Sequence, residues 1–197
     1  MAFPTTPLLD NFNRANSDPV SGNWARATGV GTGASVALFN NEVKDSMLGT
    51  AASYWLTQLG ANQEVYATAP SPVDTRGGQG LLLSWDPAAS TGYMVFWQTT
   101  AQILRSDSVG SYVVVKDVPA SLVSGDVLGG SIVGNLISLY INGSLITTYT
   151  GTTFTNRPSY IGVYCGAWSN NLDNFGGGTI TLSSDQPFPP LGRGATW

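Results

Sequence analysis

Short runs with apolar residues at every second position recur along this chain and predict β-strands. In the segment 136–141 the alternate positions from Ile137 are apolar, and the pattern resumes at Leu145 after Asn142-Gly143. Asn-Gly between two such runs is a strong hairpin signal, because both turn residues accept a positive φ. No long stretch shows the i, i+3, i+4 apolar spacing of a helix. The pattern therefore predicts an all-β chain.

About a dozen short strands are expected, separated by Gly, Asn, Asp and Pro. Two runs, 80–85 and 93–97, are apolar at nearly every position, which is typical of strands buried on both faces. They place Trp85 and Trp97 in the core. Strands at this spacing predict a sandwich or jelly roll. The other predicted strands are 36–39, 42–44, 63–68, 103–105, 112–115, 127–133, 160–164 and 178–182.

The end of the chain has a different pattern. Residues 183–197 contain three prolines, which exclude a helix and disfavour a central strand. We predict a jelly-roll domain over 1–182 and an extended Pro-rich arm over 183–197, which packs either on its own domain or on a neighbouring chain. The arm carries three apolar anchors: Phe188, Leu191 and Trp197.

Composition excludes several classes of function. Only 10% of the 197 residues are charged, against about 25% in an average domain. The net charge of −4 comes with no basic run, which argues against nucleic acid as a partner. The chain has no histidine, so Ser-His-Asp catalysis and the usual catalytic zinc sites are excluded. Cys165 is the sole cysteine, so no intrachain disulfide forms.

Targeting signals are also missing from the pattern. No apolar stretch approaches the ~20 residues of a membrane helix, so we expect no membrane insertion. The start has no basic segment and has two early prolines, unlike a secretory signal peptide. We expect a protein that stays in the cytoplasm or leaves the cell by a route such as lysis.

Motifs in a fixed order give the chain a family resemblance. They are 10–14 and 22–24 near the start, 125–127, 134–137 and 140–143 in the middle, and 162–164 and 172–175 near the end. In this order they resemble the concanavalin A-like, or laminin-G-like, jelly-roll domains over residues 8–182. The resemblance implies that the first and last strands pair, with Phe12 and Phe175 pointing into the core.

The same pairing brings two carboxylates together. Leu-Asp-Asn-Phe occurs at 9–12 and again at 172–175, so Asp10 and Asp173 would lie close to each other. Neighbouring carboxylates need a cation or a proton between them, and calcium prefers such oxygen ligands. The alternative is that each aspartate accepts backbone N–H bonds from a nearby turn. No cofactor is required by the sequence, and calcium is the one candidate.

Aromatic residues beside polar loops suggest a lectin-like surface. Sugar rings stack on Trp and Tyr, while Asn side chains bind their hydroxyl groups. The predicted glycan site consists of Trp168, Asn170, Asn171 and Tyr66. The alternative for Trp168 is that its ring fills the sandwich interior.

A glycosidase is the weakest of the functions considered. Glycosidases with this fold use paired carboxylates, and the glucanase branch carries them as Glu-x-Asp-x-x-Glu. The two glutamates, Glu42 and Glu64, are not in that pattern. The pair left to consider is Glu64 with Asp86, brought together from separate strands. We therefore expect a protein that is not an enzyme.

The resemblance also implies a setting, since domains with this opening motif are frequent in bacteriophage virion proteins. We expect a structural protein of a virion, exposed on the capsid or tail, which decorates or cements the particle or attaches it to host-surface glycans. Its partners would be other virion proteins or a second copy of itself, contacted through the arm. Lysis would release it. The first alternative is a free carbohydrate-binding module, and the second is the glycosidase.

Overall fold

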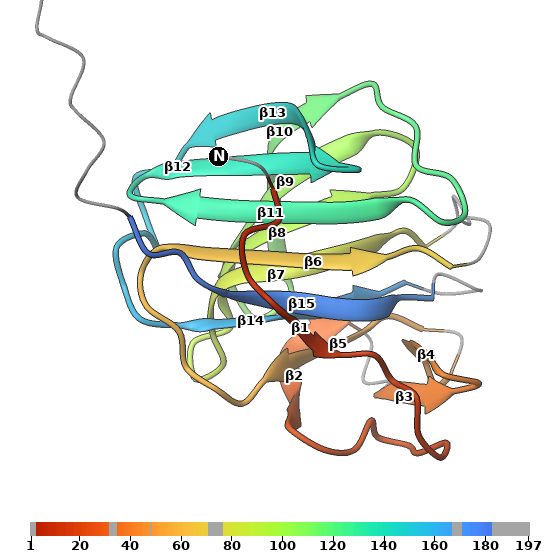
Figure 1. Ribbon diagram of the computed structural model, residues 1–197. Coiled ribbons are helices and arrows are strands. Elements are labelled where there is room, and N and C mark those ends of the chain that lie inside the picture. The colour runs from red at the N-terminus through yellow and green to blue at the C-terminus, as the bar shows by residue number, and fades with distance from the viewer. Residues whose placement is uncertain (1–2, 32–34, 48, 71–76, 167–170, 183–197) are drawn as a thin grey trace, which may run out of the picture.

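The computed structural model describes residues 3–31, 35–47, 49–70, 77–166 and 171–182 (Figure 1). Within these ranges the chain forms fifteen strands and no α-helix. It follows that none of the described segments is a helix able to cross a membrane. Trp168, Asn170 and the arm anchors Phe188, Leu191 and Trp197 lie outside the described residues. The boundary between domain and arm therefore stays a prediction.

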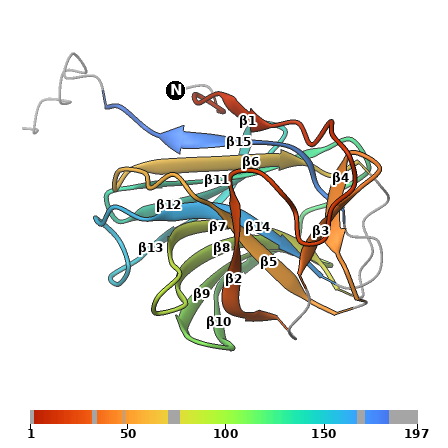
Figure 2. The same cartoon turned by 90° about the horizontal axis from the view of Figure 1, so that it is seen from below.

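The strands form two large antiparallel sheets that stack face to face (Figure 2). The six-stranded sheet has the order β1 (Leu8–Asp10), β15 (Asp173–Thr179), β6 (Gln63–Thr68), β11 (Val127–Val133), β12 (Leu136–Ile141) and β13 (Ser144–Thr150). The seven-stranded sheet has the order β10 (Ser111–Val118), β9 (Ala101–Ser108), β8 (Thr91–Trp97), β7 (Gln79–Asp86), β14 (Tyr160–Cys165), β5 (Ala51–Trp55) and β2 (Trp24–Gly31). A small hairpin joins β3 (Val36–Phe39) to β4 (Glu42–Asp45). The predicted jelly-roll sandwich is confirmed.

Local turn chemistry produces two hairpins, including the one predicted at Asn142-Gly143. Asn142 and Gly143 join β12 to β13 with φ values of 51° and 76°. Asn40 and Asn41 join β3 to β4 with φ values of 53° and 64°. Both turns need two successive residues in the left-handed region, which Asn and Gly tolerate best.

The first and last strands pair, as the family resemblance implied. Leu8 lies opposite Gly176, and Asp10 lies opposite Phe175. Phe12 and Phe175 are completely buried. Their rings pack against Trp24, with centroids at 5.8 and 4.7 Å respectively. This aromatic cluster closes the interior where the first and last strands pair.

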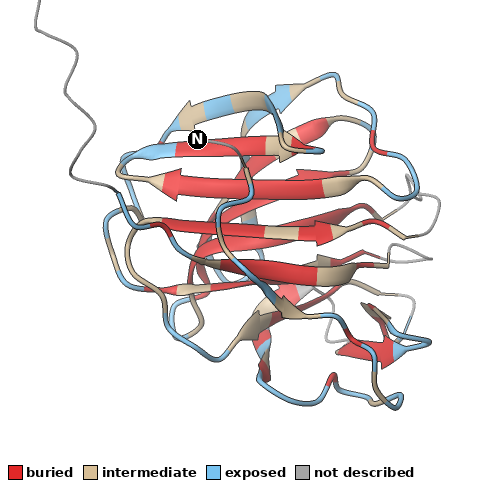
Figure 3. Cartoon of the chain, in the orientation of Figure 1, coloured by how far each residue is buried: buried red, intermediate tan, exposed pale blue. Residues whose placement is uncertain are grey.

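The interior between the sheets holds the main core, and burial is deepest along the central strands (Figure 3). A second cluster lies on the other face of the seven-stranded sheet. In β7, Leu81 and Leu83 belong to the main core while Leu82 belongs to the second cluster. In β8, Val95 belongs to the main core and Met94 to the second cluster. This alternation explains why residues 80–85 and 93–97 are apolar at nearly every position.

The curvature of the seven-stranded sheet encloses this second cluster. Its edges β2 and β10 turn toward each other (Figure 2). Gly110, in the turn before β10, donates its backbone N–H to the carbonyl of Gly29 in β2 at 2.9 Å. A Cβ on Gly29 would lie 2.8 Å from Ser90 Oγ, so the contact requires glycine there. Trp85 and Trp97 are both buried, as predicted, but Trp85 belongs to the second cluster and Trp97 to the main core.

Candidate functional site

Four tyrosines pack against the second cluster and are only partly buried. We call them the tyrosine face: Tyr54, Tyr112, Tyr160 and Tyr164. Tyr54 from β5 meets Tyr160 from β14 edge to face, with ring centroids 5.1 Å apart. Tyr164 meets Phe96 of β8 in the same manner at 5.7 Å. The strands therefore present a group of aromatic rings on one side of the molecule.

Two hydrogen-bond donors at this face have no partner. They are the indole Nε1–H of Trp85 and the hydroxyl of Tyr112. Trp85 is only 1% exposed, and buried donors are usually paired in folded proteins. Burial raises the pKa of Tyr112, and the neighbouring Tyr164 raises it further. Tyr112 thus keeps its proton at neutral pH and can donate it to an acceptor.

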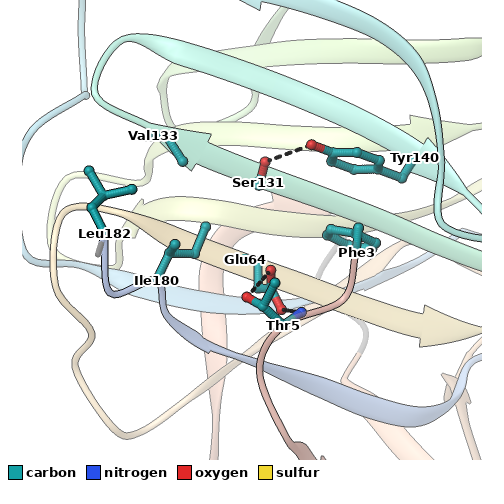
Figure 4. Close-up of a pocket in the computed structure, with 8 residues that line it drawn as sticks. All are labelled: Phe3, Thr5, Glu64, Ser131, Val133, Tyr140, Ile180 and Leu182. Carbon is teal, nitrogen blue, oxygen red and sulfur yellow. Dashed lines mark hydrogen bonds between the residues drawn. The ribbon is translucent and has the colours of Figure 1, made fainter. Parts of the chain in front are cut away.

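A separate pocket lies on the outer face of the six-stranded sheet, under the N-terminal segment (Figure 4). Its volume is about 220 Å³. The ring of Phe3 stacks on Tyr140 of β12, with centroids 4.1 Å apart and planes 8° from parallel. A Cβ on Gly129 of β11 would lie 2.2 Å from Phe3, so only glycine lets the ring rest on the sheet. We call this the N-terminal pocket; its walls are Phe3, Thr5, Glu64, Ser131, Val133, Tyr140, Ile180 and Leu182.

Glu64 of β6 is the charged group of this pocket, and its residue is 2% exposed. Its Oε1 accepts bonds from the backbone N–H groups of Thr5 and Thr6 and from the hydroxyl of Thr6. Its Oε2 accepts the hydroxyl of Thr5 at 2.9 Å. Among the described residues no Lys or Arg forms an ion pair with this carboxylate. Burial raises the pKa of Tyr66, and the charge of Glu64 raises it further.

The predicted glycan residues bind different partners. Tyr66 is on the outer face of β6, where its hydroxyl donates to the carbonyl of Thr6 at 3.1 Å. It lines a hollow of about 350 Å³ on the other side of Phe3. The Nδ2 of Asn171 donates to Glu42 at 2.6 Å, and its Oδ1 is buried without a partner. The contacts of Trp168 and Asn170 lie outside the described residues, so the predicted group of four stays a prediction.

Asp10 and Asp173 lie on paired strands, but each binds its own donors. Asp10 accepts the guanidinium of Arg14 at 2.6 Å, the backbone N–H of Phe12 at 2.8 Å and the indole N–H of Trp24 at 2.8 Å. Asp173 accepts the backbone N–H and the side-chain amide of Asn174. Each aspartate thus accepts one backbone N–H from its own turn, that of Phe12 or that of Asn174, as the alternative to calcium required.

The negative charge of Asp10 nevertheless acts on the Asp173 carboxyl group. Burial raises the pKa of Asp173, with smaller contributions from Glu42 and Asp10. In the part of the chain that the structure describes, no group of three or more His, Cys, Asp or Glu side chains could hold a metal ion. Calcium at Asp10 and Asp173 therefore remains a prediction that this geometry does not support.

Glu64 and Asp86, considered as a glycosidase pair, are on different sheets. Glu64 binds the N-terminal segment. Asp86 ends β7, accepts the backbone N–H of Ala88 at 3.0 Å and lies 3.6 Å from the guanidinium of Arg157. Each carboxylate thus has its own partners, and the described contacts do not connect the two.

Sequence reasoning missed most of both sites. The spacing of four between Tyr160 and Tyr164 places both rings on one face of a strand, so a signal for part of the tyrosine face was present. No sequence signal indicated that Thr5 would bind Glu64, because that contact joins residues 59 positions apart.

The architecture is that of a concanavalin A-like jelly-roll sandwich, and solved structures of this class are similar over most of the chain. One is a carbohydrate-binding module, CBM66 from Bacillus subtilis, with 12% sequence identity and a TM-score of 0.60. The match covers 88% of this chain and 97% of the module. A Bacillus licheniformis β-glucanase is 16% identical, covering 87% and 97%, with a TM-score of 0.58. The potassium-bound carbohydrate recognition domain of Emp46p is 9% identical, covering 81% and 90%, with a TM-score of 0.54.

At these identities the likeness shows the fold alone. No protein-family model matches the chain, and its sequence matches no curated protein. The function has to be argued from the two sites themselves, because one fold can host many activities.

Proposed function

We propose that this chain is a non-enzymatic glycan-binding domain and that its sugar site is the tyrosine face. The observation that carries the proposal is the pair of unpartnered donors, Trp85 Nε1–H and the Tyr112 hydroxyl, beneath partly buried aromatic rings. Two of the similar structures are described as a carbohydrate-binding module and a carbohydrate recognition domain, which supports this assignment.

The chemistry of this face suits a sugar. The C–H face of a pyranose stacks on an aromatic ring, and its hydroxyl oxygens accept bonds from buried donors. The indole N–H of Trp85 can only donate a hydrogen bond, and the O–H of Tyr112 has no acceptor. A ligand rich in hydroxyl oxygens offers acceptors for both donors and stacks on the partly buried rings. Both donor atoms are buried, so the proposal requires the surrounding side chains to move when the ligand binds.

Replacing Tyr54 or Tyr160 by alanine is expected to weaken glycan binding about tenfold or more, a loss of about 1.4 kcal/mol of stacking. The measurement is a glycan array with the full chain, followed by titration of the best ligand. Tyr140→Ala, on the opposite sheet, is the matched control and is expected to bind normally. Loss of binding in the control alone would move the site to the other sheet, and the absence of any glycan ligand would contradict the proposal.

We further propose that the domain works in a bacteriophage virion, exposed on the capsid or tail, with the arm as its attachment. The support is the sequence resemblance together with the low charge, and a free carbohydrate-binding module is the alternative. Light scattering over a range of concentrations separates the two. The full chain is expected to assemble, and a chain that ends at Asp185 is expected to remain monomeric. If both the full chain and the shortened chain are monomeric, the arm does not mediate self-assembly, and the free module is favoured.

A further inference from the structure

We propose that the N-terminal pocket binds a guanidinium group on an aliphatic stem, the side chain of an arginine, with Glu64 as its counter-charge. The pocket is on the six-stranded sheet, and the tyrosine face is on the seven-stranded sheet. The two proposals therefore stand or fall independently.

The charge of Glu64 calls for a cationic partner. A carboxylate that is almost fully buried is normally paired with a cation. All four bonds to Glu64 come from neutral groups of Thr5 and Thr6. Its Oε2 accepts one of these bonds, while a carboxylate oxygen accepts about two. Oε2 therefore has one unused acceptor position, and Glu64 lines the pocket (Figure 4).

The walls of the pocket match the chemistry of an arginine side chain. Phe3 and Tyr140 provide aromatic rings, on which a flat guanidinium stacks better than an ammonium group. The aliphatic side chains of Val133, Ile180 and Leu182 suit the methylene stem of an arginine. These three walls do not suit a compact inorganic cation, which has no apolar surface to bury.

The size of the pocket suits a single side chain. Sites for drug-sized ligands measure about 300–1,000 Å³, and this pocket measures about 220 Å³. It has room for one side chain rather than for an oligosaccharide. Two hydroxyl groups also line the pocket, those of Ser131 and Tyr140, and their oxygens are 3.5 Å apart. Either oxygen can accept a second hydrogen bond from the guanidinium.

The guanidinium can come from two sources. Leu182 at the pocket rim is 52% exposed and directly precedes the segment 183–197, which contains Arg193. The eleven positions from Leu182 to Arg193 can span about 36 Å when extended, which is long enough for Arg193 to enter the pocket. The other source is an arginine of another protein chain.

The test uses the full chain and two probes of the same shape. N-acetyl-arginine amide carries the guanidinium, whereas N-acetyl-citrulline amide replaces it with a neutral urea group. NMR titration is expected to show arginine binding at least tenfold tighter than citrulline. Glu64→Gln is expected to abolish this difference. Glu42→Gln changes the other glutamate and is expected to preserve it.

Further variants complete the test. If Glu64→Gln fails to fold, Val133→Phe fills the pocket from its rim and is expected to block the probe. Arg193→Gln distinguishes the sources: a variant that binds the probe at least fivefold tighter identifies the chain's own arginine, and equal binding identifies another chain. Equal affinity for the two probes would overturn the proposal. Unchanged selectivity in Glu64→Gln, or no binding to either wild type or Arg193→Gln, would also overturn it.

Discussion

Replacing Phe175 by alanine is expected to lower the free energy of unfolding by about 3–5 kcal/mol. The ring is completely buried where the first and last strands meet. Its centroid lies 4.7 Å from that of Trp24 and 6.2 Å from that of Trp55, so its removal leaves a cavity between two large rings that cannot collapse. Domains are stable by only about 5–15 kcal/mol, so the loss is a large part of the total. Urea unfolding followed by tryptophan fluorescence measures it.

Leu145→Ala is the control for this substitution. Leu145 lies on edge strand β13 and is 56% exposed. Its truncation is expected to change the free energy of unfolding by no more than about 0.5 kcal/mol. Similar losses in the two variants would show that the aromatic cluster around Phe175 is not a centre of stability.

Asp10→Ala is expected to cost about 3 kcal/mol, because it leaves three donors without their acceptor. Arg14, Phe12 and Trp24 all donate to this carboxylate. The Asp10 side chain is 9% exposed, so water cannot fully replace the lost acceptor. The same unfolding experiment measures the change, and Asp10→Asn is expected to lose less because its amide oxygen still accepts a bond.

The chain supplies a matched ion pair for comparison. Arg105 and Asp107 are also 2.6 Å apart, but the Asp107 side chain is 37% exposed. Asp107→Ala is expected to cost about 1 kcal/mol or less, since exposed ion pairs contribute little. If the two alanine variants were equally destabilised, the argument from burial at Asp10 would be wrong.

Much of the fold could be predicted because its signals are local. Asn142-Gly143 determines a turn by its own backbone preferences, and the alternation on either side determines which face is buried. The pairing of the strands near Asp10 and Asp173 came instead from the family resemblance. The burial of Trp85 and Trp97 followed from the length of the apolar runs around them.

The sites depend on contacts that no local pattern records. The apolar runs showed that β7 and β8 are covered on both faces, but not that the curl of their own sheet provides the second cover. Glu64 was considered as one carboxylate of a glycosidase pair with Asp86, whereas it binds Thr5 and Thr6. The same N-terminal segment places Phe3 on Tyr140, and both contacts join residues far apart in the sequence.

The pairing of β1 with β15 has a consequence for synthesis of the protein. Leu8 and its partner Gly176 are 168 positions apart. At about 5–20 residues per second, the ribosome makes the first strand roughly ten to thirty seconds before the last. During that interval β6 lacks its neighbour β15, and an unpaired strand can join another nascent chain. We therefore expect the native sandwich to close only after β15 has left the ribosome, with chaperones protecting the open sheet until then.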